Sequence, residues 1–134
     1  MMRKLSAVVL AAATIGMTFT GAAHAETNPK CPTGVTQIGS TKYLKSGSAT
    51  VASIKQFKGC GKNWAYVYVW DSWKSGHPNF EASAAITRGD GDIDINNGRR
   101  GQQEVWSDGA NTLQFCTMAH GIVDRLQGFT NEVC

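Results

Sequence analysis

A run of seven residues, Trp64 to Trp70, alternates aromatic with small aliphatic side chains. Every second residue is a tryptophan or tyrosine, and the residues between them are Ala65, Val67 and Val69. Successive side chains of a β-strand point to opposite faces, and β-branched and aromatic residues favour strands. The run therefore predicts a strand that is apolar on both faces. Since only one face must join a core, the other face is a candidate binding surface.

Similar short runs recur along the chain, separated by glycine and other turn residues about every ten positions. The pattern contains no convincing amphipathic helix, and it predicts an all-β domain, either a small antiparallel β-sandwich or a barrel. The Asp-Gly-Ala-Asn sequence at 108–111 is typical of a hairpin turn between its two flanking strands. The expected strands cover residues 36–44, 49–57, 64–70, 92–96, 103–107 and 112–118. Residues 81–87 form a further strand, although their alanines would suit a helix about as well, and residues 121–126 form a last strand or a helical turn.

The first 25 residues have the three parts of a secretory signal peptide. Arg3 and Lys4 give a basic start, residues 7–13 are apolar, and Ala23-His24-Ala25 forms a cleavage site. A membrane anchor is the alternative, but the apolar run is shorter than the roughly 20 residues that a span needs. Removing 25 of the 134 residues leaves 109, which is the size of one domain at 26–134.

The charge of this secreted part is nearly balanced. Loss of Arg3 and Lys4 leaves 11 basic against 10 acidic residues, a net charge of +1. Such a balance gives no general case for nucleic-acid binding. Beyond residue 25 no stretch is apolar enough to cross a bilayer. We therefore expect a secreted protein with no membrane span and no nucleic-acid partner.

All four cysteines lie in the part after residue 25. An even number of cysteines in an exported chain predicts disulfides, whereas zinc sites need closely spaced pairs that are absent here. Three pairings are possible. We favour Cys31 with Cys60 and Cys116 with Cys134, because each bond then closes a local loop.

Signatures of catalysis are scarce. The sequence contains no nucleophile elbow, no zinc-protease motif and no phosphate-binding loop. A small secreted nuclease or hydrolase would have to use His77 and His120, with Glu81 and Arg88 as the neighbouring carboxylate and cation. No spacing forces these four residues together, so ordinary surface histidines are the favoured interpretation. We expect no cofactor.

The segment from Arg88 to Asn96 contains two short motifs. Asp90, Asp92 and Asp94 alternate with other residues and resemble a weak calcium site, but the segment fails the EF-hand pattern. Arg88-Gly89-Asp90 also matches a cell-adhesion tripeptide, although a three-residue match arises readily by chance. Neither motif predicts a functional site by itself.

The aromatic residues give the stronger hypothesis. Rings at alternate positions of an exposed strand would form a flat platform for stacking a ligand. The favoured interpretation, however, is that the rings fill the core, and that Ala65, Val67 and Val69 lie under a loop or at an interface. In that case the tyrosine hydroxyls need hydrogen-bond partners. The candidate binding residues are Trp64, Tyr66, Tyr68 and Trp70, extended by Trp73 and Trp106.

Several short segments resemble one family. They are Cys31-x-x-Gly34-Val35, residues 47–55, Cys60-Gly61-x-Asn63-Trp64-Ala65, residues 106–116, Gly121 and Cys134. In these segments the chain resembles small secreted actinomycete proteins of the spore-associated protein A type, and neighbouring exported domains without an assigned function. The resemblance implies a secreted, disulfide-bonded β-protein associated with the spore or cell surface, and it transfers no catalytic residues.

Three functional hypotheses follow. The leading one is a secreted, non-enzymatic module at the cell or spore surface, or one that binds a polymer such as a cell-wall or other extracellular polysaccharide. The alternative is an inhibitor of an extracellular hydrolase, whose partner would be a protein contacted by residues 73–80 and 108–111. The third is a hydrolase that uses His77 and His120.

Overall fold

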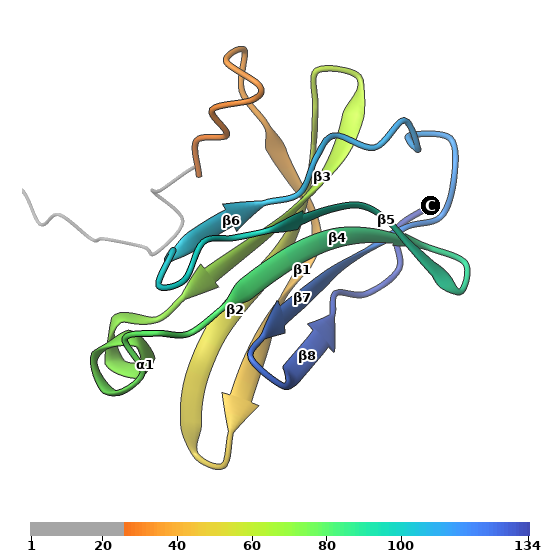
Figure 1. Cartoon of the computed structure of the whole chain (residues 1–134). Coiled ribbons are helices and arrows are strands. Elements are labelled where there is room, and N and C mark those ends of the chain that lie inside the picture. Colours follow the sequence, from red (N-terminus) through yellow and green to blue (C-terminus); the bar gives the residue numbers. More distant parts are fainter. Residues whose placement is uncertain (1–25) are drawn as a thin grey trace, which may run out of the picture.

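Two antiparallel four-stranded sheets face each other in the computed structural model, which describes residues 26–134 (Figure 1). Sheet A has the strand order β1-β2-β3-β6, and sheet B has the order β5-β4-β7-β8. The all-β prediction is confirmed in its sandwich form, whereas the expected signal peptide at 1–25 lies outside the described residues. The elements are β1 (Thr36–Ser46), β2 (Ala49–Gly59), β3 (Lys62–Val69), α1 (Asp71–Gly76), β4 (Ala82–Arg88), β5 (Gly91–Asn97), β6 (Glu104–Trp106), β7 (Met118–Val123) and β8 (Leu126–Phe129).

The chain builds most of sheet A first and then crosses between the sheets. β1, β2 and β3 are consecutive hairpin strands, and α1 leads from β3 to β4 in sheet B. After β5 the chain returns to sheet A for β6 and then crosses again to β7. The helix α1 was not expected from the sequence. Within residues 26–134 no helix is long and apolar enough to span a membrane.

The predicted hairpin at 108–111 is wrong. Ala110 instead forms an isolated bridge with Asn63 at the start of β3, through two backbone hydrogen bonds of 2.9 Å. A Cβ atom on Gly109 would lie 2.8 Å from the indole of Trp64, so the chain runs flat against the sheet here. Asn63 Nδ2 also donates to Thr112 Oγ1 (2.7 Å). These contacts hold residues 107–112 alongside β3 and prevent them from folding back as a hairpin.

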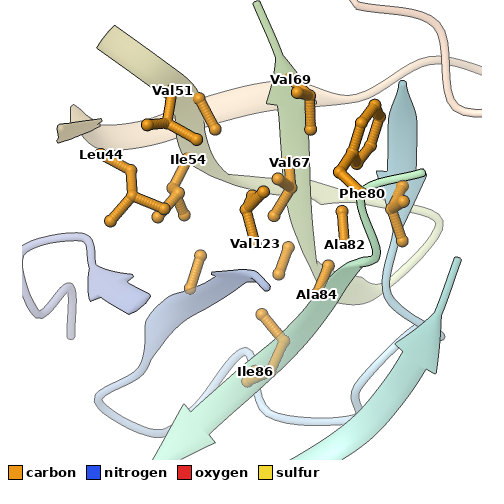
Figure 2. Packing of buried hydrophobic residues seen from close by; sticks show 14 of the residues in the cluster. Leu44, Val51, Ile54, Val67, Val69, Phe80, Ala82, Ala84, Ile86 and Val123 are labelled. Atoms are coloured by element: carbon orange, nitrogen blue, oxygen red, sulfur yellow. The ribbon is translucent and has the colours of Figure 1, made fainter. Parts of the chain in front are cut away.

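The space between the sheets is filled by aliphatic side chains and one aromatic ring, that of Phe80 (Figure 2). Ala65, Val67 and Val69 of β3 point into this core and are completely buried. The favoured interpretation from the sequence, in which the rings of the aromatic run fill the core, is therefore wrong. The sheets approach each other closely at Gly121 of β7, where a Cβ atom would lie 2.6 Å from Ile54. Only a glycine fits this position without displacing core side chains.

Both disulfides have the predicted pairing, Cys31 with Cys60 and Cys116 with Cys134. Cys60 lies in the two-residue turn between β2 and β3, where it and Gly61 both have positive φ (54° and 69°). This is the conformation of a type I′ turn, which suits a tight hairpin. The first bond thus ties residues 26–35 to the end of sheet A, and the second ties the last residue to the segment before β7.

Candidate functional site

The outer face of sheet A carries the aromatic side of β3. Strand register places Phe57 of β2 opposite Trp64, and Trp106 of β6 opposite Tyr66. These rings form a second apolar cluster with Cys31, separate from the core between the sheets. The Tyr66 and Trp106 ring centroids are 4.5 Å apart. Cys31 and Val35, which belong to the segment drawn in orange in Figure 1, pack against these rings and cover this end of the outer face.

The six candidate binding residues consequently divide into two groups. Trp64, Tyr66 and Trp106 are buried, with at most 6% of each residue exposed, so they cannot offer a ring face to a ligand. Trp73 lies on α1 and stacks on His77, with ring centroids 3.7 Å apart. Tyr68 and Trp70 remain accessible, and Trp70 is 36% exposed. A continuous platform of six rings is thus not formed.

A smaller aromatic surface exists at the other end of the same face. Tyr43 of β1 and Tyr68 of β3 both pair with Ser53 of β2, one from each side. Two strand spacings place the two tyrosines about 10 Å apart, with the small serine on the floor between them. The indole of Trp70 reaches over this floor. Its Nε1 donates to Ser53 Oγ (2.9 Å), and its ring meets the Tyr43 ring edge-on at 6.2 Å.

A cleft of about 550 Å³ lies beside this surface, between the exposed and the covered ends of sheet A. Its floor comes from neighbouring strands, and one wall comes from the start of the described chain. The volume falls in the range of small-molecule sites, which combine apolar walls with a few placed polar groups. The residues that line it are Glu26, Thr27, Ser53, Lys55, Tyr66, Tyr68 and Glu104.

The polar groups of the cleft are held in place by one another. Tyr66 donates its hydroxyl hydrogen to Glu104 Oε1 (2.6 Å), which supplies the partner that a buried tyrosine needs. The Lys55 ammonium pairs with Glu26 on the facing wall. Beside the cleft, Gln103 Nε2 donates to Asp71 Oδ1 (2.6 Å). A ligand would therefore meet groups that are already oriented.

The carboxylates set the electrostatics of this region. Burial raises the pKa of Tyr66 above its usual 10.0, and the hydrogen bond and negative charge of Glu104 raise it further. Burial also raises the pKa of Tyr68, followed by the charges of Asp71 and Glu104. Both shifts mean that the tyrosines stay neutral hydrogen-bond donors, and the smaller contributions to them come from negative charges nearby.

Sequence reasoning missed most of the residues of this site. Tyr43, Ser53, Lys55 and Glu104 are dispersed along the chain and come together only through the register of four strands. A pairing of the expected strands at 36–44 and 49–57 would have placed Tyr43 near the aromatic strand. The position of Glu26 could not be inferred either, because it lies in a segment that packs on the sheet next to the Cys31–Cys60 disulfide and pairs there with Lys55.

The structure does not gather the proposed catalytic set. His77 stacks on Trp73, while Glu81 forms an exposed ion pair with Arg100 (3.6 Å). The guanidinium carbon of Arg88 lies 3.3 Å from the centroid of the Phe115 ring. His120 is buried on sheet B, where its Nδ1 lies 2.7 Å from Asp92 Oδ2. Each of the four residues thus has its own separate partner.

The predicted carboxylate ligands are also dispersed. Asp92 accepts a hydrogen bond from Thr87 (2.6 Å) and pairs with His120, and Asp94 lies at a bulge with φ 53°. Among residues 26–134 a single trio of possible ligands comes within 4.8 Å, and it comprises Glu132 with the disulfide-bonded Cys116 and Cys134. Asp90, Asp92 and Asp94 therefore do not form a three-ligand site. In the adhesion-like tripeptide, Arg88 packs on Phe115.

The outer face of sheet B has its own hollow of about 510 Å³. The rings of His120 and Phe129 stack beside it, with centroids 4.1 Å apart, and His120 Nε2 lies 2.9 Å from Gln127 Oε1. Phe129 is 41% exposed. This face therefore offers an exposed ring comparable to Trp70 on the opposite side of the sandwich.

The chain matches no protein-family model, no curated protein and no solved structure. The resemblance to spore-associated proteins stays a prediction.

Proposed function

We propose that this protein is an extracellular polysaccharide-binding module whose binding surface is the open end of the outer face of sheet A. The observation that carries the proposal is the cleft of about 550 Å³ beside the exposed ring of Trp70. The two disulfides are compatible with an extracellular location. No catalytic step is included in this proposal.

The arrangement suits a sugar better than a flat apolar ligand. A pyranose ring has apolar C–H faces that bury against an aromatic ring, and hydroxyl groups at its edge that need hydrogen-bond partners. Trp70, Tyr43 and Tyr68 supply the rings. Lys55, Glu26 and Glu104 supply donors and acceptors within the adjoining cleft. Because Trp70 is held by Ser53, little side-chain freedom is lost when a ligand binds.

The open shape of the surface favours a polymer. The region extends from Tyr43 on the edge strand β1, across β2 and β3, to Glu104 on the other edge strand β6. Four strands spaced about 4.8 Å apart give a width of roughly 14 Å, which accommodates two or three linked sugar rings. The spore or cell surface, which the resemblance implies, would present such polymers to a secreted protein.

The test is retention on insoluble polysaccharides. Residues 26–134 are incubated with chitin, partly deacetylated chitin, cellulose and peptidoglycan, and the bound fraction is measured against protein concentration. We expect retention on at least one polymer and a roughly tenfold weaker affinity for Trp70→Ala, a change of about 1.4 kcal/mol. Phe129→Ala is the matched control, because it removes an exposed ring from the opposite sheet.

Two results would overturn the proposal: no polymer retains the protein, or Trp70→Ala binds as tightly as the unmodified chain. The inhibitor alternative would gain support from a stoichiometric loss of activity when the protein is added to an extracellular hydrolase. Of its two contact segments, residues 108–111 lie flat along β3. The segment at 73–80 includes the last turn of α1, a helix in which no residue is fully buried.

A further inference from the structure

The charge of the cleft identifies the kind of sugar that fits it. Three carboxylates, those of Glu26, Glu104 and Asp71, lie in or beside the cleft, whereas Lys55 is the cation among its lining residues. Lys55 is already paired with Glu26. Cleavage after Ala25 would add an α-ammonium group at Glu26, and the local charge would still be negative.

Two of the carboxylates have no cationic partner. In the part of the chain that the structure describes, the ion pairs are Lys30–Asp108, Lys55–Glu26, Arg100–Glu81 and His120–Asp92. Glu104 and Asp71 take part in none of them and accept hydrogen bonds from neutral groups, Tyr66 and Gln103. Each of these carboxylates therefore has no basic side chain beside it, and one of its two oxygens accepts no hydrogen bond in these contacts.

The exposed rings strengthen the attraction for a cation. Aromatic faces attract ammonium groups through their quadrupole, and tryptophan does so most strongly. Trp70 and Tyr43 are exposed at one end of sheet A. At the same end, Tyr68 of β3 is paired with Glu104 of β6. Tyr68 and Glu104 are direct neighbours, whereas Trp70 and Tyr43 lie towards the other edge strand, so the carboxylates and the exposed rings act on different parts of one bound polymer. Sulfated, phosphorylated or uronic-acid polymers would instead be repelled.

We infer that the cleft binds amino sugars with free ammonium groups, so that its preferred ligand is a deacetylated hexosamine polymer. In this complex the ring of one sugar lies against Trp70, and the ammonium group lies between Tyr68, Glu104 and Asp71. The inference rests on the proposed function, which it narrows from polysaccharides in general to a cationic class. A lysine-rich peptide offers a similar charge but lacks the C–H faces that stack on the indole.

Calorimetric titration of residues 26–134 tests this inference. The ligands are a β-1,4-linked tetramer of glucosamine, the matching tetramer of N-acetylglucosamine, a neutral glucose tetramer and a lysine tetrapeptide. The titrations are made at about pH 5.5, where glutamate and aspartate are ionised. We expect the glucosamine tetramer to bind about tenfold more tightly than its acetylated counterpart, and its affinity to fall as salt is added.

The decisive variants are Glu104→Gln and Asp71→Asn. Both keep the size of the side chain, and in Glu104→Gln the new amide oxygen would still accept a hydrogen bond from Tyr66. We expect each to lower the preference for glucosamine over N-acetylglucosamine about three- to fivefold, as an exposed charge contact predicts, with little change in binding of the acetylated tetramer. Glu132→Gln, which removes one exposed charge at a different hollow, is the matched control.

The outcomes separate this inference from the proposed function. Equal binding of all sugar tetramers, lost in Trp70→Ala, would overturn the cationic preference and leave the polysaccharide-binding proposal standing. Tighter binding of the lysine peptide than of the glucosamine tetramer would overturn the sugar assignment. Absence of binding to any sugar would overturn both. An unchanged preference in Glu104→Gln and Asp71→Asn would contradict the role of the carboxylates.

Discussion

Tyr66 shows how one side chain links the covered and open halves of the outer face of sheet A. Its ring packs between Phe57 and Trp106 in the covered cluster, whereas its hydroxyl reaches Glu104 at the cleft. The sequence predicted a hydroxyl partner for the tyrosines only where their rings are buried, and the buried Tyr66 does have one. The sequence could not name Glu104, because the two residues are 38 positions apart and meet only when β6 pairs with β3.

Replacing Tyr66 with phenylalanine should change how stability depends on pH. The folded state raises the pKa of this tyrosine, so the unfolded chain loses the proton first. The protonated hydroxyl of Tyr66 therefore contributes its full stabilisation of the folded state below about pH 10, and this contribution is lost as the pH rises above that value. Between about pH 8 and pH 11, the free energy of unfolding of Tyr66→Phe should fall about 1 kcal/mol less than that of the unmodified protein.

Urea titration at the two pH values measures this difference. At about pH 8 the variant should be about 1 kcal/mol less stable, because it lacks one hydrogen bond. Tyr43→Phe, at a half-exposed tyrosine, is the control and should shift stability equally at both pH values. If the free energy of unfolding falls equally with pH in Tyr66→Phe and in the unmodified protein, the Tyr66 proton does not contribute to the pH dependence of stability.

Gly121 tests the close approach of the two sheets. Gly121→Ala places a Cβ atom 2.6 Å from Ile54 and 2.9 Å from Val67, so core side chains must move. We expect a loss of about 1–3 kcal/mol in chemical denaturation. Gly91→Ala, where a Cβ atom meets nothing within 4 Å, should change stability by less than about 0.5 kcal/mol. Equal effects of both substitutions would contradict the packing described for the core.

At the scale of elements, β3 illustrates what the sequence could predict. Its alternation correctly indicated a strand that is apolar on both faces, and most other strands were also expected close to their observed bounds. The sequence could not decide which face joins the core, because both are apolar. That choice depends on β2, whose Ala52 and Ile54 point to the same side as Val67, and on the segment that covers the rings.

The covering segment should depend on the Cys31–Cys60 disulfide. Replacing both cysteines with serine removes the bond that closes a loop with a sequence separation of 29. We expect a loss of roughly 3–4 kcal/mol from loop entropy, and greater accessibility of Trp64 and Trp106. Replacing Cys116 and Cys134 is the control, since it should destabilise the fold without exposing these rings in the native state.

Urea denaturation and tryptophan quenching under native conditions check this prediction together. If the Cys31→Ser/Cys60→Ser variant leaves quenching unchanged, residues 26–35 are held over the sheet by packing alone. A rise in quenching restricted to this variant would confirm that the disulfide keeps one half of the outer face closed.

At the scale of the whole molecule, the sandwich presents two outer faces of different character. Sheet A carries the cleft with unpaired carboxylates beside Trp70, and sheet B carries the stacked pair of His120 and Phe129. The fold class followed from periodicity. The cysteine spacing left three disulfide pairings open, and the favoured one is confirmed. The site did not follow from the sequence, because it is assembled from one or two residues of each of four strands and one leading segment.

The most direct measurement is acrylamide quenching of the unmodified protein and Trp70→Phe, each with and without the glucosamine tetramer. Trp64 and Trp106 are buried and Trp70 is 36% exposed, so Trp70 should supply much of the quenchable emission. The account predicts that the tetramer protects the unmodified protein and that this protection disappears in Trp70→Phe. Equal protection of both proteins would place the sugar elsewhere, and no protection of the unmodified protein would contradict binding at this surface.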